Sequence, residues 1–316
     1  MKKQKFRLVY ILKLRLQASK RLCRFGRRLW ASKRLCRFGR RLWASMTGYA
    51  AHRNYCNYVK KELLKSSLSL IEPSGVEIKL LDMCCGRGGD IFKWDSLGIR
   101  RVYAFDSDSA SVQEAIRRYR DYRRKTARTP ITVNFHVQSA LSSKYIRDTI
   151  LRGTKVNIVS CMFALHYFCD LRTFLRNVSD NLNPGGIFVG VAPDSTYIKK
   201  LLDPDDPYKN DEVSVRKAPS EVRSPTDSVR EAYYFLIKGD ETQPTDYFTF
   251  RGESLEYLID KDELVSLARE VSLELIEMKN IADGCATNGF AVSVDAFGRL
   301  PPTAQLYFSF IFRRFA

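Results

Sequence analysis

Apolar and polar positions alternate with two different periods from residue 55 onward. Apolar runs of about 4–8 residues, typical of buried strands, are separated by longer segments in which apolar residues recur at every third or fourth position, as in amphipathic helices. The runs predict strands at 76–83, 101–108, 131–137, 156–165 and 184–193. The longer segments predict helices at 55–68, 90–97, 110–125 and 170–182. Strands alternating with helices indicate an α/β fold, with a parallel sheet that helices cover on both faces.

The pattern becomes less regular after residue 200. Residues 203–228 are rich in Pro, Asp and Ser and are expected to form an exposed insertion. Short apolar segments follow at 235–240, 247–252 and 254–260, then a helix at 261–270 and strands at 273–278 and 306–312. The segment 279–304 contains Gly and Pro and is expected to be a long loop. We therefore expect one domain over 46–316, beginning at Met46 and carrying insertions.

The first 45 residues differ from the rest of the chain in charge. They hold 16 of the 53 Lys and Arg residues and none of the 35 acids, so the remainder of the chain is nearly neutral. The 13-residue segment ASKRLCRFGRRLW at 18–30 recurs unchanged at 31–43, which is more typical of a recent duplication than of a structural repeat. We expect a basic, disordered head at 1–45. Four interpretations of it stay open: an RNA-binding tail, a nuclear import signal, an Arg-rich transit peptide or an extension without function.

Two further features narrow the functional classes. No run approaches the roughly 18 apolar residues that a membrane-spanning helix requires, so no membrane association is expected. The eight cysteines show no paired C-x-x-C spacing. This usage is typical of thiols in a reducing compartment and gives no reason to expect a bound metal.

The segment LLDMCCGRGGD at 80–90 carries the first candidate chemistry. Glycines between a strand and a helix let the backbone approach a ligand closely, and the N-terminus of the helix presents unpaired N–H groups. An acid that ends the next strand, Asp106 or Asp108, can accept both hydroxyls of a ribose. By itself this spacing also fits a dinucleotide-binding fold or a tight structural turn. The loop D-x-x-C-G-R-G-G-D, the NPGG before the fifth strand and the two closing strands favour S-adenosylmethionine over NAD.

Several motifs occur in the order that is typical of one family. They are RNYCNYVKKEL, LLDMCCGRGGDIFKW, AFDSDSASVQEAIRRY, CMFALHYF, NPGGIFVGVAP, SLEYLID and LYFSFIFRR. Over residues 50–316 the sequence resembles the mRNA cap (guanine-N7) methyltransferases of eukaryotes and their viruses. The resemblance implies a class I methyltransferase (Rossmann-like) fold, with a mostly parallel seven-stranded sheet and a C-terminal antiparallel hairpin. It also implies methyl transfer from S-adenosylmethionine to N7 of the terminal guanine of GpppN-RNA, with S-adenosylhomocysteine as product and no metal.

The resemblance assigns residues to two adjacent pockets. The methyl-donor pocket would comprise Lys60, Asp82, Cys84, Gly86, Asp106, Ser139, Met162 and Tyr167. The cap pocket would comprise Asn57, Arg87, Lys93, Arg118, Phe163, His166, Pro193, Glu256 and Tyr307. Lys60 would pair with the methionine carboxylate of the donor, and Asp106 would hold its ribose. Glu256 would face the N1 and N2 hydrogens of guanine and His166 its O6, while the three cations of the second set would meet the triphosphate.

This chemistry requires positioning rather than proton transfer. Guanine N7 carries a lone pair and no proton, and a sulfonium is already an activated leaving group, so no general base is needed. The protein must hold N7 in line with the S–CH₃ bond, a task that the resemblance gives to His166, Glu256 and Tyr307. A carboxylate facing N1–H and N2–H₂ also stabilises the positive charge that develops on the ring.

Three residues of the donor pocket depart from the family's pattern. Cys84 stands where glycine is usual, Ser139 where an aspartate commonly meets adenine, and Met162 where glutamine is common. A cysteine at position 84 is tolerable if its φ is negative and strained if its φ is positive. We therefore expect donor binding to be the weaker of the two pockets' interactions.

Alternatives stay open at this point. Taken singly, His166, Phe163 and Tyr307 could be ordinary core residues, and Glu256 and Arg118 could lie on a solvated surface. The chain could also be a methyltransferase for another substrate, or a non-catalytic cap-binding or RNA-binding homologue that has lost the donor.

The resemblance also implies partners. The substrate would be the capped 5′ end of mRNA, and a separate RNA triphosphatase and guanylyltransferase would perform the earlier capping steps. Whether a stimulatory subunit takes part stays open. A monomer in the nucleus is expected, or in the cytoplasm if the protein comes from a virus that replicates there.

Overall fold

The computed structural model describes residues 49–72, 75, 77–126, 131–202, 207–209, 213–219, 222–223, 229–237, 253–283 and 302–315. All of these residues belong to one compact unit. The basic head expected at 1–45 and the apolar segment at 247–252 lie outside the described residues, and so does most of the loop expected at 279–304.

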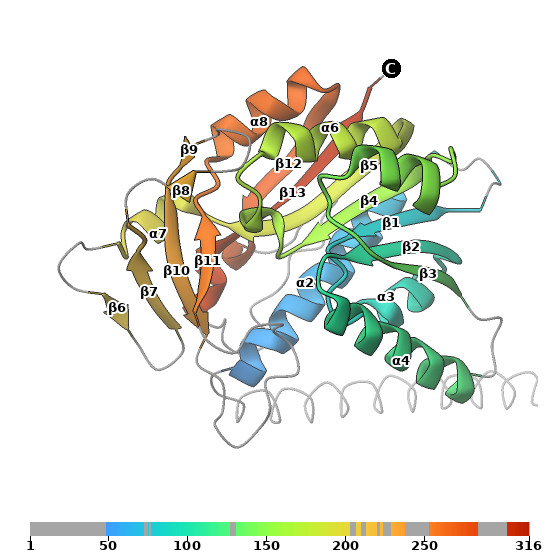
Figure 1. Cartoon of the computed structure of the whole chain (residues 1–316), viewed down its shortest axis with the longest axis horizontal. Helices are drawn as coiled ribbons and strands as arrows, with labels where there is room; N and C mark the ends of the chain where they lie inside the picture. Colours follow the sequence, from blue (N-terminus) through green and yellow to red (C-terminus); the bar gives the residue numbers. More distant parts are fainter. Residues whose placement is uncertain are drawn as a thin grey trace, which may run out of the picture. The chain divides into compact units, whose positions relative to one another are not determined.

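A seven-stranded sheet forms the centre of this unit, in the order β12-β13-β5-β4-β1-β2-β3 (Figure 1). Its strands are β1 (Lys79–Met83), β2 (Arg101–Asp106), β3 (Thr132–Val137), β4 (Val156–Met162), β5 (Leu182–Pro193), β12 (Leu273–Asn280) and β13 (Tyr307–Arg314). The five strands β1 to β5 are parallel to one another. β13 is antiparallel to both β5 and β12. The expected mostly parallel sheet with a closing antiparallel hairpin is confirmed.

Helices cover both faces of the sheet. They are α2 (Tyr49–Ser69), α3 (Ile91–Ser96), α4 (Ser109–Lys125), α5 (Ser143–Tyr145), α6 (Leu171–Asn181), α7 (Ser195–Lys199) and α8 (Lys261–Glu270). α6 and α8 lie on one face of the sheet, and α3 and α4 on the other (Figure 1). An aspartate caps α4, α6, α7 and α8, because its carboxylate accepts a hydrogen bond from a backbone N–H of the first turn. Among the described helices, none is both long and apolar enough to cross a bilayer.

Some element boundaries differ from the expectation. α2 begins at Tyr49 rather than at residue 55, and α5 continues into a π-helical turn, η1 (Ile146–Ile150), in a region with no predicted element. The fourth strand was expected to reach residue 165 but ends at Met162. Phe163 has a φ of 61°, which is incompatible with extended backbone, and the 3₁₀ turn η2 (Leu165–Tyr167) follows it.

A second, four-stranded antiparallel sheet has the order β11-β10-β7-β6. Its strands are β6 (Tyr208–Lys209), β7 (Val213–Lys217), β10 (Ala232–Ile237) and β11 (Ser254–Tyr257), and β8 (Val222–Arg223) pairs separately with β9 (Val229–Arg230). The expectation that 203–228 is an exposed insertion is wrong for β7, where Val213 is 1% exposed and Val215 is fully buried. A strand of only five residues between polar segments gives too short an apolar pattern to be predicted from the sequence. This sheet is important because β11 carries Glu256.

The core of the central sheet is aromatic around β5 and β13. Phe188 of β5 packs against Phe310 and Phe312 of β13, with ring centroids 5.0 and 6.1 Å apart. Gly190 lies opposite Phe310 in the β5–β13 register, and a Cβ at that position would collide with the Phe310 ring and the carbonyl of Cys161. The glycine therefore allows the two strands to pack closely, and this packing fixes the position of Tyr307 at the start of β13.

Candidate active site

The glycine loop after β1 is held against the end of β2. Gly86 and Gly88 have φ of 50° and 72°, the left-handed region that favours glycine. A Cβ on Gly88 would come 2.9 Å from Cδ1 of Ile91 and 3.0 Å from Cβ of Ala115, so no larger residue fits there. The backbone N–H of Gly86 donates to Oδ2 of Asp106 at 2.9 Å. The loop therefore lies close to the carboxylate that ends β2.

Asp106 is positioned for ligand binding by backbone contacts. Its Oδ1 accepts a hydrogen bond from the N–H of Asp108 at 3.0 Å, in addition to the bond from Gly86 to Oδ2. The side chain is half-buried. Each carboxylate oxygen can accept a second hydrogen bond, so these contacts leave capacity for the hydroxyls of a ribose.

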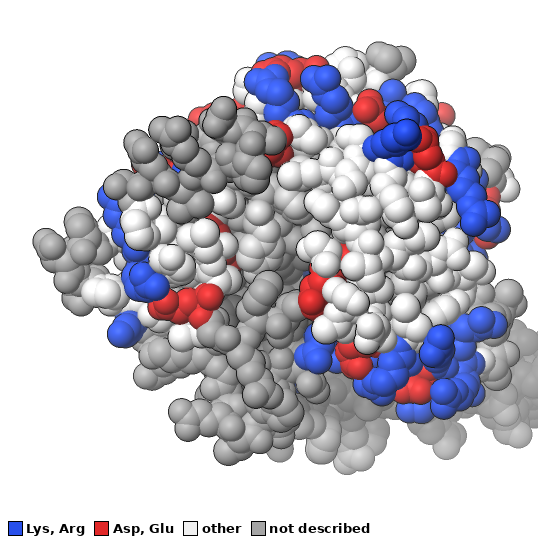
Figure 2. Space-filling model, viewed as in Figure 1, with Lys and Arg blue, Asp and Glu red and all other residues white. Residues whose placement is uncertain are grey.

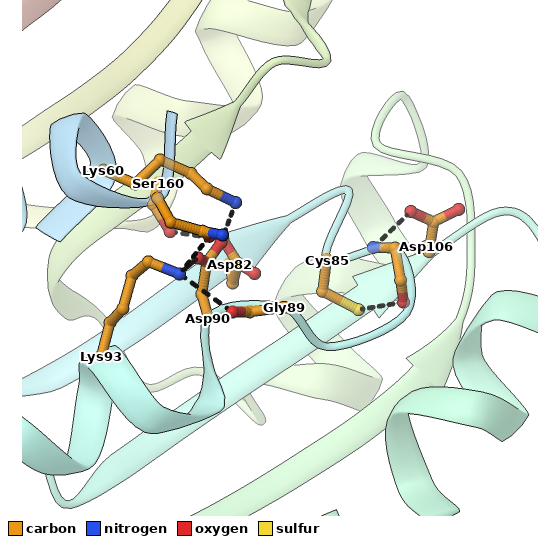
Figure 3. Close-up of polar contacts among 10 residues, drawn as sticks. Lys60, Asp82, Cys85, Gly89, Asp90, Lys93, Asp106 and Ser160 are labelled. Atoms are coloured by element: carbon orange, nitrogen blue, oxygen red, sulfur yellow. Dashed lines mark hydrogen bonds and ion pairs between the residues drawn. The ribbon is translucent and has the colours of Figure 1, made fainter. Parts of the chain in front are cut away.

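A buried ionic cluster lies beside the glycine loop (Figure 3). Nζ of Lys60 donates to Oδ2 of Asp90 at 3.0 Å, and Nζ of Lys93 lies 2.7 Å from Oδ1 of Asp90. Lys93 also donates to Oδ1 of Asn57 at 2.8 Å and to the carbonyl of Gly89 at 2.9 Å. Asp90 stands at the N-cap of α3 but makes no cap bond, because its carboxylate is used by the two lysines. Lys60 and Lys93, expected in separate pockets, thus share one carboxylate.

The charges of this cluster shift its pKa values in opposite directions. Burial alone would raise the pKa of Asp90, but the ammonium groups of Lys60 and Lys93 outweigh it and hold that pKa below its usual range. Burial lowers the pKa of Lys93, and the charge of Asp90 opposes this. For Asp82, whose Oδ1 accepts a hydrogen bond from Ser160 at 2.5 Å, burial and then the charge of Asp90 raise the pKa well above its usual value. Of the two buried carboxylates, Asp82 and Asp90, it is therefore Asp90 that stays ionised.

Cys84 is held in the left-handed region, with a φ of 67°. This is the case in which a cysteine was expected to be strained, because a Cβ-bearing residue there costs about 1–2 kcal/mol relative to right-handed backbone. A hydrogen bond with Cys161, followed by burial, raises the pKa of the Cys84 thiol well above its ordinary value. The side chain is therefore a protonated packing group rather than a nucleophile.

Substitutions of Cys84 test whether its backbone limits donor binding. Cys84→Gly is expected to leave binding of S-adenosylhomocysteine unchanged or to tighten it by a few-fold, because glycine adopts this φ without strain. Cys84→Val is expected to weaken binding by about tenfold, because β-branched residues adopt positive φ least readily. Isothermal titration calorimetry at fixed pH measures both. Equal affinities of the glycine and valine variants would show that the backbone of residue 84 does not limit the site.

The other two departures from the family's pattern have local structural roles. Oγ of Ser139 accepts from the N–H of Leu141 at 3.3 Å, and the N–H of Ser139 donates to Oε1 of Gln138 at 2.7 Å, so this residue shapes the turn after β3. Met162 is the last residue of β4 and is buried. Both lie at the carboxyl ends of parallel strands of the same sheet, as their assignment to the donor pocket requires.

Glu256 is a buried carboxylate within hydrogen-bond distance of two hydroxyl groups. It is 4% exposed. The hydroxyl of Tyr233 donates to Oε2 at 2.7 Å, and the hydroxyl of Ser254 donates to Oε1 at 2.8 Å. Tyr233 is directly opposite Glu256 in the β10–β11 register. Neither Tyr233 nor Ser254 was identified from the sequence, because the pairing of β10 with β11 has no local signal.

His166 completes this polar group. Its Nε2 lies 3.7 Å from Oε1 of Glu256, and its ring centroid lies 4.3 Å from that of Tyr167. Burial lowers the pKa of His166, although the charge of Glu256 opposes the shift, so the imidazole is neutral near pH 7. Its buried Nδ1 has no hydrogen-bond partner among the described residues. A buried and unsatisfied polar atom of this kind fits a site that a polar ligand completes.

Aromatic and apolar residues adjoin this group. The rings of Phe163 and Tyr307 meet edge to face with centroids 5.1 Å apart. Tyr307 is also paired with Pro193 at the end of β5. The three residues assigned to packing around the guanine base therefore lie together. η2, which carries His166, contacts β11.

The remaining cations are placed differently. Arg118 lies on α4, where its Nε donates to Oε1 of Glu114 at 2.7 Å. Arg87 is half-buried in the glycine loop. The hydrogen bond with Ser111 lowers the pKa of Asp108 most, burial opposes this shift, and the charge of Arg87 adds a smaller lowering. Among the described residues, no group of three or more His, Cys, Asp and Glu side chains could hold a metal ion.

The sheet order, the glycine loop and the carboxylate that ends β2 define a class I S-adenosylmethionine-dependent methyltransferase fold. A solved structure of such an enzyme from Clostridium acetobutylicum ATCC 824 matches with a TM-score of 0.52 and 14% identity, over 90% of this chain and 99% of that chain. At this identity the match shows the shared fold alone. The family model for the mRNA (guanine-N(7))-methyltransferase domain matches residues 48–289, and the chain belongs to this family.

Curated relatives carry the corresponding name. The mRNA cap guanine-N(7) methyltransferase of Drosophila melanogaster is 29% identical over 252 residues, which are 73% of this chain and 55% of the fly protein. The Caenorhabditis elegans protein of that name is 36% identical over 46% of this chain and 40% of its own length. The Saccharomyces cerevisiae protein is 29% identical over 71% and 51%, respectively. The chain thus spans about half the length of the curated relatives it matches.

Proposed function

We propose that this protein transfers a methyl group from S-adenosylmethionine to N7 of the terminal guanine of capped mRNA. The observation that carries the proposal is the buried Glu256 carboxylate, held by Tyr233 and Ser254 beside a neutral His166 whose Nδ1 has no hydrogen-bond partner in the described part of the chain. A guanine edge offers two adjacent N–H donors to a carboxylate and an oxygen to a nearby donor group. A small apolar acceptor would offer no hydrogen-bond partner to the buried Glu256 and His166 side chains, and buried polar atoms need partners.

The donor pocket fits the methyl donor on structural grounds. A Cβ on Gly86 or Gly89 would meet no atom within 4 Å, so the loop leaves open space beside the Asp106 carboxylate. We assign donor contacts to Lys60, Asp82, Cys84, Gly86, Asp106, Ser139, Met162 and Tyr167. S-adenosylmethionine, when bound, supplies a methyl group on a positively charged sulfur. Asp90 fixes the Lys60 ammonium group at the edge of this pocket.

The cap pocket then needs only to orient the base. We assign it to Asn57, Arg87, Lys93, Arg118, Phe163, His166, Pro193, Glu256 and Tyr307. Glu256 selects guanine through its N1 and N2 hydrogens and stabilises the positive charge that develops on the ring. Phe163 and Tyr307 exclude water from the base, and the lysine and arginine side chains bind the triphosphate. No side chain has to accept a proton, because N7 carries none.

Two further assignments accompany this proposal. Residues 46–316 would hold the whole catalytic domain, with 1–45 dispensable for the chemistry. Separate triphosphatase and guanylyltransferase enzymes would supply the GpppN end. The protein would act as a monomer in the nucleus, where mRNA is capped.

Methylation with a labelled donor tests the function directly. The chain, and the same chain without residues 1–45, are incubated with methyl-labelled S-adenosylmethionine and GpppA, and the products are digested to nucleotides. We expect label in 7-methylguanosine, with kcat/KM of the two proteins on GpppA equal within about twofold, since a charged tail acts mainly on long RNA.

Each alternative has its own outcome. Cap binding without S-adenosylhomocysteine binding would identify a non-catalytic homologue. Label on free guanosine at the same rate as on GpppA would indicate a different substrate. A shortened chain that folds but cannot methylate GpppA would refute the assignment of the domain to 46–316.

A further inference from the structure

An open pocket lies away from the candidate active site, along the edge strand β3. Its volume is about 670 Å³, and α4, β2, β3 and the segment between η1 and β4 line it. Among the strands that the structure describes, β3 is at the edge of the central sheet and pairs only with β2. The pocket includes Arg101 at the amino end of β2 and Arg152 before β4. These two residues lie at the opposite ends of the strands from Asp106 and Met162, whereas His136 extends the lining towards the carboxyl end of β3. None of the residues assigned to the donor and cap pockets is among the described residues that line this pocket.

The lining of the pocket is strongly basic. Arg101, Arg120, Arg123 and Arg152 line it, and no Asp or Glu is found among the described residues that do so. Arg101 pairs with Glu77 at 2.7 Å. Arg120 and Arg152, both exposed, form no ion pair with any residue in the described ranges. On the face shown in Figure 2, basic side chains over α4 are interleaved with acidic ones.

The same pocket contains aromatic surfaces. Tyr119, Phe135 and His136 line it and are half-buried. The rings of Tyr119 and Phe135 lie 5.8 Å apart, and the guanidinium group of Arg123 lies 5.9 Å from the centre of the Tyr119 ring. Cations combined with aromatic rings are typical of surfaces that bind single-stranded nucleic acid, because unpaired bases stack on the rings while the cations contact phosphates.

The edge of β3 is poorly suited to a peptide strand. The hydroxyl of Tyr119 donates to the carbonyl of Ile131 at 2.5 Å and accepts from the N–H of Val133 at 3.3 Å. These contacts occupy two of the backbone groups that an added strand would need at the start of β3. The chemistry of the pocket therefore favours an anionic chain over β-strand addition.

Helix α4 connects this pocket with the cap pocket. It begins at Ser109, three residues after Asp106, and ends at Lys125. Arg118, assigned to the triphosphate, lies five residues before Arg123, a separation of about 8 Å along the helix axis. Five residues also rotate by about 140° around the helix axis, so a strand that leaves the cap pocket at Arg118 would have to pass around α4 as well as along it to reach Arg123.

We propose that this pocket binds the single-stranded RNA that follows the cap, with Arg120, Arg123 and Arg152 at the phosphates and Tyr119, Phe135 and His136 against the bases. The proposal rests on the proposed function, since only a capped RNA places such a strand next to the cap pocket. It adds a second contact region that a cap dinucleotide cannot reach. The pocket would therefore make long capped RNA a better substrate than GpppA, through KM rather than kcat.

The test compares two double variants of the full chain. Arg120→Ala/Arg152→Ala removes two pocket cations, and Arg176→Ala/Arg269→Ala removes two exposed arginines on α6 and α8 as a matched charge control. Fluorescence anisotropy measures binding of an uncapped single-stranded RNA of about 12 nucleotides. The pocket variant should bind about tenfold more weakly at physiological salt. The slope of log affinity against log salt should fall by about 1.4, since each phosphate contact on a single strand contributes about 0.7.

Steady-state kinetics with two substrates distinguish a role of the pocket in RNA binding from a role in methyl transfer. KM for capped RNA of that length should rise about tenfold in the pocket variant, while kcat/KM for GpppA should equal that of the parent, because a dinucleotide ends before α4's Arg123. The head at 1–45 is present in all three proteins, so its contribution cancels. Failure of the parent to methylate GpppA would refute the proposed function, whereas the anisotropy comparison would still report on the pocket.

Three results would overturn the proposal. The first is RNA binding by the pocket variant equal to that of the parent, and the second is an equal loss in the control variant. The third is parental binding of a polyglutamate peptide as tight as that of RNA, with both lost in the pocket variant. That result would assign the pocket to an acidic protein segment.

Discussion

Replacing Glu256 by alanine is expected to lower kcat/KM for GpppA by about a thousandfold. The carboxylate is buried and is held by the hydroxyls of Tyr233 and Ser254, so its orientation is fixed before substrate binds. Its loss leaves two guanine N–H donors unpaired in a desolvated pocket and removes the charge that stabilises the methylated ring. Together these effects cost about 4 kcal/mol of transition-state stabilisation, which corresponds to about three powers of ten.

Three variants separate this role from a structural one. Glu256→Gln keeps the shape but lacks the charge, and we expect a loss intermediate between those of the wild type and the alanine variant. Tyr233→Phe removes one orienting donor and should raise KM for GpppA with a smaller change in kcat. Glu253→Ala, a change at a neighbouring exposed acid that pairs with Arg216, should have little effect. Near-wild-type turnover of GpppA by a folded Glu256→Ala protein would show that the cap pocket is misassigned.

The central sheet could be predicted from the sequence because its strands are short apolar segments bounded by polar or glycine-containing ones. β1, β4 and β5 are buried on both faces, so each is an almost continuous apolar segment with a helix before or after it. The glycine loop was equally visible. Gly86 and Gly88 adopt left-handed φ, and a Cβ on Gly88 would also lie too close to Ile91 and Ala115, so these two positions favour glycine.

The second sheet and the details of the site could not be predicted. β10 and β11 are joined by a long segment, and nothing local indicates that Tyr233 lies opposite Glu256. The left-handed φ of Phe163 carries no sequence signal, because phenylalanine rarely adopts this conformation. Asp90 was visible in the glycine-rich motif and its contact with Lys93 is local, but its contact with Lys60 depends on where α2 packs.

The ionic cluster that Asp90 forms explains how two lysines can be buried beside the donor pocket. Lys60 and Lys93 are 6% and 8% exposed, and one carboxylate compensates both charges. Burial, and after it the charge of Asp90, raises the pKa of Asp82 to about 7, so Asp82 contributes less negative charge than a second fully ionised carboxylate would. The stability of the loop and the position of Lys60 therefore depend on the same residue.

Asp90→Asn is accordingly expected to lower the free energy of unfolding by about 3 kcal/mol, because removal of one partner leaves buried charges uncompensated. Asp82 limits the loss, since its own pKa should fall once Asp90 is neutral and it can then compensate part of the Lys60 charge. Urea denaturation at pH 7 measures the difference. Glu77→Gln, which breaks the exposed pair with Arg101, is the control and should cost about 1 kcal/mol or less.

The pH dependence of the difference provides an independent check. The pKa of Asp90 is lowered in the folded protein, so its contribution to stability is fully present above the unfolded pKa of about 3.9 and is lost as the pH falls through the lower folded value. The wild type and the Asn variant should therefore differ most above about pH 5, and the difference should shrink steadily as the pH falls below about 3.9 towards the lower folded pKa of Asp90. A difference that stays constant over this range would mean that Asp90 stabilises the fold through packing, and that the charges of Lys60 and Lys93 are compensated by other groups.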